Sequence, residues 1–252
     1  MKLQRYFLHL AYDGTNYSGW QVQPKVNTVQ ETIEKALRIF VPDVKCIIGC
    51  GRTDTGVHAK DYYAHFDTNV EIHPEIVYKL NAVLPIDISI KDCFTAKEHV
   101  HARFSATDRS YEYFVHFAKD PFKNQYSVYH SKVINIDLMN VACAYLLGEQ
   151  DFSAFSKSRT QTFTNMCNVK FAHWETIDDG MVFKITANRF LRNMVRAIVG
   201  TMFKIGEGAI PPEELKTIIA GKERSAAGKS VHPQGLFLSK IIYPQFHGPD
   251  NR

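Results

Sequence analysis

Apolar residues along the chain follow two periods, which alternate in short blocks. Residues 3–12 alternate between apolar and polar positions and predict a strand. Residues 28–40 carry apolar side chains at helical spacing, and Thr28 has a glutamate three residues later, so a capped helix is expected there. The apolar run 44–50 predicts a strand that leads directly into the segment GRTDTGVHA, residues 51–59.

The rest of the chain continues this mixture. The apolar pattern of 190–205 predicts the longest helix, on which Arg189, Arg192 and Arg196 would form one ridge. Because strands and helices mix without strict alternation, the pattern predicts an α+β fold of two similar subdomains that meet at a central sheet, with a boundary near residue 105. The remaining predicted elements are strands near 87–93, 110–117, 163–175, 181–187 and 235–243, helices opened by Pro74 and Pro211, and a helix capped by Asp137.

Composition adds mainly exclusions. The 252 residues are 45% hydrophobic and 22% charged, as in an ordinary globular protein. The start of the chain is too short and too polar for a signal peptide, and no run approaches 18 apolar residues, so we expect a cytoplasmic protein that does not enter a membrane. The five cysteines include no CxxC pair, which favours reduced thiols and no metal site.

Positive charge is concentrated late in the chain. Between Lys184 and Lys229 there are nine Lys/Arg and four acidic residues, an excess of +5 against a net charge of +4 for the whole chain. This basic window favours a polyanionic partner, although a solvated helix face would give the same count.

The segment GRTDTGVHA raises the question of what Asp54 does. An aspartate on a glycine-flanked turn is most often a backbone cap, in an Asx turn. The trimer D-T-G suggests a half aspartic protease that dimerises, but such enzymes need two aspartates that share a proton. The chain has one D-T-G, and the adjacent Arg52 would hold Asp54 ionised, which disfavours the protease.

Read nine residues wide, GRTDTGVHA resembles the catalytic loop of the tRNA pseudouridine synthase A family, whose pattern is close to GRTDAGVHA. Further motifs follow in family order, so the resemblance covers roughly residues 5 to 244. These motifs are AYDGTNYSGWQVQP (11–24), TVQETIEKAL (28–37), NAVLPIDI (81–88), HARFSATDRSYEY (101–113) and NRFLRNMVRAIVG (188–200).

The resemblance implies a fold, a reaction and partners. The fold would be that of pseudouridine synthases, with two ferredoxin-like α+β subdomains sharing a mostly antiparallel central sheet. Residues 1–105 would carry the catalytic loop and residues 106–252 would complete the cleft. The reaction would be the cofactor-free and metal-free isomerisation of uridine to pseudouridine at positions 38, 39 or 40 of the tRNA anticodon stem-loop, by a homodimer. A non-catalytic tRNA-binding or folding module of the same fold is the alternative.

The resemblance also assigns site residues. Asp54 matches the nucleophile, and the sequence leaves open whether it attacks C6 of the base or C1′ of the ribose. Arg196 matches the arginine that pairs with this aspartate, with a surface helix charge as the alternative. Tyr111 matches the tyrosine that stacks on the target base, while a core role is favoured for Tyr113. Arg52 matches the arginine that enters where the base leaves, with a phosphate contact as the alternative.

Four other positions refine this picture. We expect His58 to make a backbone or phosphate contact rather than to act as an acid or base, and Trp20 to pack rather than to stack on RNA. Thr55 departs from the family pattern, where alanine is commoner. Cys167 lies near the place of a family arginine, which puts in question the RNA positions served.

Overall fold

The computed structural model describes residues 3–97, 99–157 and 163–244, and the chain divides into two compact units. The first unit takes in the chain up to Thr107 and again from Leu238 onward, and the second unit is Asp108–Phe237. The passage between units at Thr107 lies close to the expected boundary near 105, whereas the last strand joins the first unit. The roles expected for 1–105 and 106–252 stay predictions.

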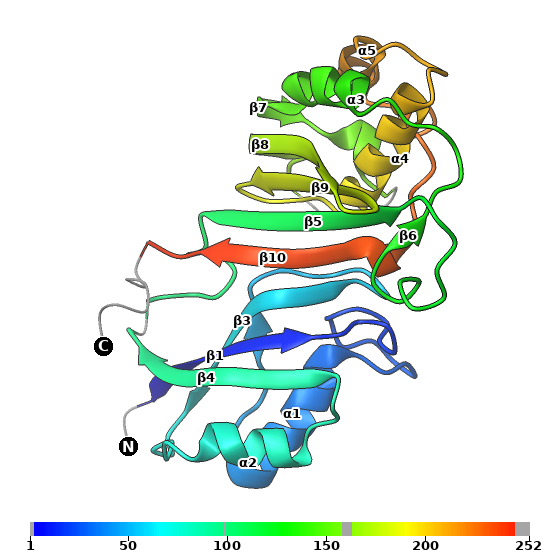
Figure 1. Ribbon diagram of the computed structural model, residues 1–252. Coiled ribbons are helices and arrows are strands. Elements are labelled where there is room, and N and C mark those ends of the chain that lie inside the picture. Colours follow the sequence, from blue (N-terminus) through cyan, green and yellow to red (C-terminus); the bar gives the residue numbers. More distant parts are fainter. Residues whose placement is uncertain (1–2, 98, 158–162, 245–252) are drawn as a thin grey trace. The chain divides into compact units, whose positions relative to one another are not determined.

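The first unit comprises β1 (Gln4–Tyr12), α1 (Val29–Phe40), β2 (Ile48–Gly49), β3 (His58–Thr68), α2 (Ile76–Val83), β4 (Ile88–Ala96) and most of β10 (Leu236–Ile242). Up to β4 this is the β-α-β-β-α-β order of ferredoxin-like subdomains. Its strands are ordered β4-β1-β3-β10, with β2 also paired to β3 (Figure 1). β1 is antiparallel to both of its neighbours, and α2 contacts β4 and α1.

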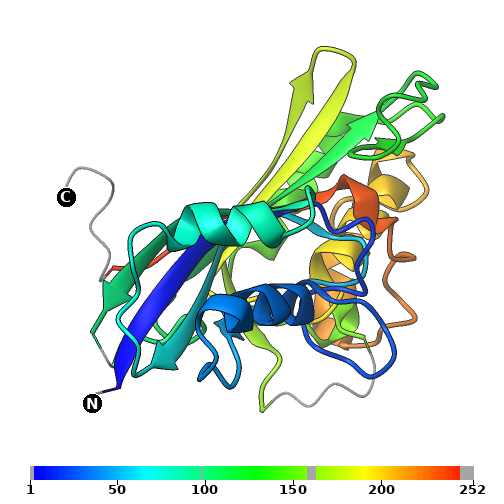
Figure 2. The same ribbon diagram turned by 90° about the horizontal axis from the view of Figure 1, so that it is seen from below.

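The second unit comprises β5 (Asp108–His116), β6 (Val128–Tyr129), α3 (Ile136–Cys143), η1 (Ala144–Leu146), β7 (Gly148–Asp151), η2 (Ser153–Phe155), β8 (Met166–Ile177), β9 (Gly180–Ala187), α4 (Met194–Gly206), α5 (Glu214–Gly221) and η3 (Pro233–Gly235). Its strands are ordered β5-β9-β8-β7, all antiparallel, and β6 pairs with β5 in parallel. The expected α+β class with mostly antiparallel strands is confirmed. Figure 2 shows the strands and helices of both units from a second direction.

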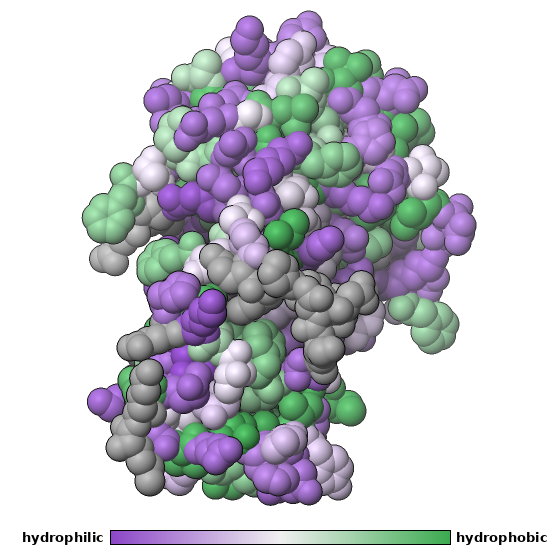
Figure 3. Space-filling view, turned by 90° about the vertical axis from the view of Figure 1, so that its left-hand side faces the viewer, coloured by the Kyte–Doolittle hydropathy of each residue, from purple (hydrophilic) through white to green (hydrophobic). Residues whose placement is uncertain are grey.

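Each unit has its own aromatic core. In the first unit Phe7 and Phe66 are fully buried, and in the second Trp174 stacks on Phe183 with ring centroids 4.9 Å apart. α4 is buried along most of its length, which accounts for its apolar sequence. On the face drawn in Figure 3, hydrophobic and hydrophilic residues are interspersed, as expected of an ordinary protein surface.

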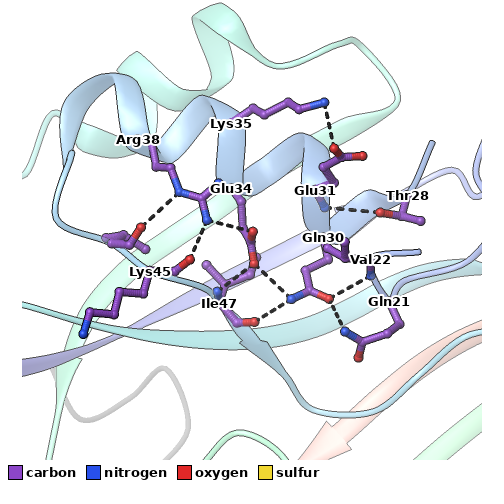
Figure 4. A network of polar contacts seen from close by, with 11 residues as sticks. Gln21, Val22, Thr28, Gln30, Glu31, Glu34, Lys35, Arg38, Lys45 and Ile47 are labelled. Atoms are coloured by element: carbon purple, nitrogen blue, oxygen red, sulfur yellow. Dashed lines mark hydrogen bonds and ion pairs between the residues drawn. The ribbon is translucent and has the colours of Figure 1, made fainter. Parts of the chain in front are cut away.

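The strand expected over 44–50 is wrong for its first half, because only Ile48–Gly49 pairs as β2. The backbone of the preceding segment bonds to side chains of α1 instead (Figure 4). The Arg38 guanidinium donates to two carbonyls of the segment, and the N–H of Ile47 donates to the Glu34 carboxylate at 3.0 Å. Side chains thus satisfy backbone groups that a strand would have paired with a neighbouring strand.

The helix expected over 190–205 begins later, at Met194. Asn193 has φ 67°, a left-handed conformation that an α-helix does not continue through, and its side chain donates to Ser230. Arg189 and Arg192 therefore precede the helix, and the predicted ridge of three arginines is wrong. Arg196 alone of the three lies on α4.

Two helix caps were predicted, one correctly. The Thr28 side chain accepts from the Glu31 N–H at 3.4 Å and caps α1, as expected. The expected cap at Asp137 is wrong. Asn135 caps α3 by accepting from the N–H groups of Asp137 and Leu138. Asp137 therefore lies in the first turn, where its negative charge interacts favourably with the helix dipole.

The sequence led us to expect no membrane span, reduced cysteines and no metal site, and the described part of the chain bears on each of these expectations. None of its helices is long and apolar enough to cross a membrane. All five cysteines are free thiols, as expected. Among the residues described, no group of three or more His, Cys, Asp or Glu side chains is placed to hold a metal ion.

Candidate active site

Asp54 lies on the loop between β2 and β3 in the first unit, and its carboxylate side chain is half-buried. Three other segments hold the loop backbone and side chains. The Tyr62 hydroxyl donates to the Gly51 carbonyl, and the buried Tyr12 hydroxyl lies 2.8 Å from the hydroxyl of Thr53. The N–H of Gly56, at φ 75°, donates to the Tyr17 carbonyl at 3.2 Å. The residues on both sides of Asp54 are thereby fixed.

The segment 13–20 lies against this loop so closely that it needs glycine at two places. Gly19 has φ 86°, and a Cβ added there would stand 2.4 Å from the Thr53 carbonyl oxygen. A Cβ added at Gly14 would stand 2.0 Å from the Val57 carbonyl oxygen. Both distances are far inside van der Waals contact, so the two glycines allow 13–20 to pack closely against residues 50–57, the aspartate loop.

The backbone-cap interpretation of Asp54 meets an obstacle in this geometry. An Asx turn at Asp54 would use its carboxylate to bind the N–H groups that follow. Instead the N–H of Gly56 bonds to Tyr17, and the N–H of Val57 bonds to the Asp54 carbonyl at 3.2 Å. Backbone carbonyls thus accept from both of these N–H groups.

His58 is buried at the start of β3, and the expectation of a backbone contact is confirmed. Its Nδ1 lies 3.1 Å from the Gly14 N–H and 2.9 Å from the Asp13 carboxylate. A neutral ring accepts from Gly14 at this atom, and a protonated ring donates to Asp13. Either form ties β3 to the 13–20 segment, which makes His58 a support of the loop.

Two further predictions concern the surroundings of the loop. Trp20 is 1% exposed and stacks on Tyr62 with ring centroids 4.1 Å apart, so the packing interpretation is confirmed. Arg52 is exposed, and its Nε donates to the Gln21 side-chain oxygen at 3.3 Å. Sequence reasoning missed the supports Tyr12, Tyr17 and Tyr62, whose aromatic rings gave no signal that distinguished them from core residues.

The two tyrosines of SYEY lie on β5 in the second unit and differ in burial. Tyr111 is half-buried and meets the Phe190 ring edge-on, with centroids 5.1 Å apart. Tyr113 is fully buried, and its hydroxyl donates to the His232 carbonyl at 2.9 Å. Burial raises the pKa of Tyr113 well above its ordinary value, and the nearby positive charge of Arg196 offsets part of that rise. The expected core role of Tyr113 is confirmed.

Arg196 is half-buried on α4, and its guanidinium faces the segment before η3. Its Nε donates to the Val231 carbonyl at 2.8 Å, while its own carbonyl accepts from the Val231 N–H at 3.2 Å. These contacts do not fit a solvated surface charge. The expected pairing of Arg196 with Asp54 joins the two units and stays a prediction, as does the stacking of Tyr111 on a base.

Some of the Lys and Arg residues in the basic window, 184–229, form ion pairs or hydrogen bonds within the second unit. Lys184 pairs with Glu175, and Lys222 pairs with Asp151 at 2.9 Å. The Arg224 guanidinium donates to the Gly228 carbonyl and the Ser230 hydroxyl. With Arg196, four of the nine basic residues have partners inside the unit, so the count of charges overstates what an RNA could meet.

Comparison with known proteins bears on this site. A family model described as tRNA pseudouridine synthase matches residues 142–244. A solved structure, that of an unknown protein from Galdieria sulphuraria, aligns at 10% identity over 74% of this chain and 81% of its own with a TM-score of 0.24, too weak a likeness for any argument.

Curated relatives cover nearly the whole of both chains. The chain is 44% identical to tRNA pseudouridine synthase A of Bacteroides fragilis over 97% of its length and 98% of the relative's. It is 45% identical to the protein of that name from Bacteroides thetaiotaomicron, over 96% and 92%, and 39% identical to that from Bacillus subtilis, over 93% and 97%. With 39–45% identity over 93–97% of the chain, the protein belongs to the tRNA pseudouridine synthase A family.

Proposed function

We propose that this protein isomerises uridine to pseudouridine in tRNA, at positions 38, 39 or 40 of the anticodon stem-loop, with Asp54 as the nucleophile. Asp54 takes part in breaking the C1′–N1 glycosidic bond, and the uracil is re-attached through C5. The reaction is redox-neutral and uses no cofactor. The enzyme acts as a homodimer in the cytoplasm.

One observation carries the proposal for Asp54. The loop that bears it is held at Gly51, Thr53 and Gly56 by hydrogen bonds to Tyr62, Tyr12 and Tyr17. A nucleophile that must attack a substrate needs such a rigid support. Family membership supports the reaction class, because the curated relatives are named for it.

The remaining assignments follow the same reasoning. Arg196 pairs with the Asp54 carboxylate, Tyr111 stacks on the target uracil, and Arg52 enters the space that the base leaves. Stacking on an aromatic ring contributes roughly 1–3 kcal/mol, comparable with the few kcal/mol that flipping a nucleotide out of a helix costs.

Release of tritium from tRNA transcribed with C5-tritiated uridine tests the reaction, since C5 loses its hydrogen when the new bond forms. Wild-type protein in the presence of EDTA should release tritium, and Asp54→Asn should reduce the rate at least about a thousandfold while changing tRNA affinity little. Asp178→Asn, at an exposed turn, is the matched control and should be fully active. Absence of release by wild type would overturn the proposal.

Two measurements test its finer parts. Pseudouridine mapping in tRNA from a deletion strain should show loss at positions 38 to 40 and restoration by wild type but not by Asp54→Asn. Restoration by Asp54→Asn would favour the non-catalytic module. Light scattering of the purified protein should give twice the mass of one chain, and a monomeric mass would contradict the homodimer.

A further inference from the structure

We propose that Gln21 is a positioning residue for Arg52, and that Gln30 and Glu34 hold Gln21 in place. The inference rests on the proposed function, in which Arg52 acts at the site of the departing base. It assigns a role in turnover to a chain of polar side chains in the first unit, most of which Figure 4 shows. This series of side chains extends from the buried side of α1 to the surface beside the aspartate loop.

The series of hydrogen-bonded side chains begins at Glu34, a buried acid on α1. Its carboxylate accepts from the Ile47 N–H at 3.0 Å, from the Gln30 amide at 3.0 Å and from the Arg38 guanidinium at 2.9 Å. A carboxylate bound to a guanidinium only accepts hydrogen bonds, so each group that faces it must be a donor. Glu34 therefore sets the direction of every hydrogen bond that follows.

Gln30, one turn before Glu34 on α1, has one permitted orientation. Its amide NH₂ donates to the Glu34 carboxylate and to the Ile47 carbonyl, both at 3.0 Å. Its amide oxygen must then face the opposite way, where it accepts from the Gln21 amide at 2.8 Å and the Val22 N–H at 3.0 Å. A reversed amide would set two acceptors against an oxygen and two donors against an NH₂. Because Gln30 is buried, water is not at hand to relieve this.

Gln21 passes this orientation to the surface. Its NH₂ is directed at Gln30, so its side-chain oxygen is presented to Arg52, whose Nε lies 3.3 Å away. Without a partner of fixed geometry, an exposed arginine samples many rotamers, and ordering it costs conformational entropy. A half-buried Gln21 restricts Arg52 before the tRNA binds, so less of that cost falls on the reaction.

A double-mutant cycle tests this role. Gln21→Met keeps the length of the side chain and removes its hydrogen bonds. It should lower kcat/KM for tritium release about tenfold in the wild-type background and less than about twofold when Arg52 is already alanine. Gln23→Met is the matched control in the same loop, since the Gln23 amide donates only to the Ser18 carbonyl in the described contacts, and it should leave kcat/KM unchanged.

A second readout does not depend on activity. In the free protein, nitrogen-15 NMR should show restricted motion of the Arg52 Nε–H group in wild type and motional averaging of that group in Gln21→Met. Equal loss of kcat/KM by Gln21→Met in both backgrounds, or an unchanged Arg52 signal, would overturn the positioning role while wild type stays active. Failure of wild type to release tritium would overturn the proposed function itself, and with it the role in turnover.

Discussion

The aspartate loop of the first unit and the Tyr111–Arg196 region of the second unit present their side chains from two different kinds of backbone. Asp54 lies on irregular chain, held by hydroxyl, carbonyl and ring contacts from the segments around residues 12–20, 58 and 62. Tyr111 lies within the antiparallel pair of β5 and β9, and Arg196 lies in the first turn of α4.

The difference shows where each kind of site is vulnerable. The backbone groups of a helix bond within the helix and those of a strand bond to its neighbouring strands, so a side chain there can be changed with little effect on the backbone. The aspartate loop has no such ladder, and its shape depends on close approach of other segments. We therefore expect substitutions around the loop to move Asp54, and substitutions in the second unit to act one side chain at a time.

The largest effect on stability is expected for Gly19→Ala. The new Cβ would collide with the Thr53 carbonyl and would strain a backbone at φ 86°. Together these cost about 4 kcal/mol of the free energy of unfolding, from about 1–2 kcal/mol of left-handed strain and the rest from overpacking. Displacement of the loop should also lower tRNA turnover about a hundredfold. Urea denaturation and the tritium assay measure the two effects.

The control for this change lies in the second unit. Gly208 has φ 73°, and outside residues 207–209 no heavy atom of the described residues lies within 4 Å of a Cβ added there. Gly208→Ala should therefore lower the free energy of unfolding only by the left-handed strain of about 1–2 kcal/mol, and tRNA turnover should be unchanged. Equal losses for the two variants would contradict the idea that close approach, rather than conformation, holds the aspartate loop.

A smaller effect is expected from acid, through His65 on β3. Burial, with help from Arg5 and His101 and against Asp67, lowers the pKa of His65 from 6.5 to about 4. Between these values the unfolded chain binds a proton that the folded protein does not, so stability is full above pH 6.5 and is lost as pH falls to 4. The loss is about 3 kcal/mol at most.

The measurement is urea denaturation from pH 7.5 to 4.5. His65→Asn should flatten the dependence, because the Asn side chain does not titrate and its oxygen can replace Nδ1 as acceptor for the Ala102 N–H, which lies 3.1 Å from that atom in the wild type. His173→Asn, at an exposed position of β8, should leave the dependence as in wild type. A wild-type profile in His65→Asn would show that His65 is not the titrating support.

The smallest effect distinguishes the two tyrosines of β5. Tyr113→Phe leaves the His232 carbonyl without its donor and should cost about 1 kcal/mol of unfolding free energy, with turnover within about twofold of wild type. Tyr111→Phe, at a half-buried position, should change stability by less than about 0.5 kcal/mol. The reverse order of stabilities would contradict the separate core and surface roles of these residues.

The sequence by itself determined most of the regular structure. Alternation located β1, and helical spacing with Thr28 located α1, because burial of one face and a local cap leave a periodic record in the chain. Long motifs in order located the family, and Asp54 within it. The predicted elements appear in the expected order, but the sequence predicted neither β3 nor the short strands β6 and β7.

Tertiary structure decided what has no period. The segment before β2 pairs with the side chains of Glu34 and Arg38 rather than with a strand, and α4 begins only after the left-handed Asn193. The close approach of Gly19 to Thr53 and the link from Glu34 to Arg52 likewise join residues far apart in sequence. Such hydrogen bonds and packing depend on position in space, and residue order does not record them.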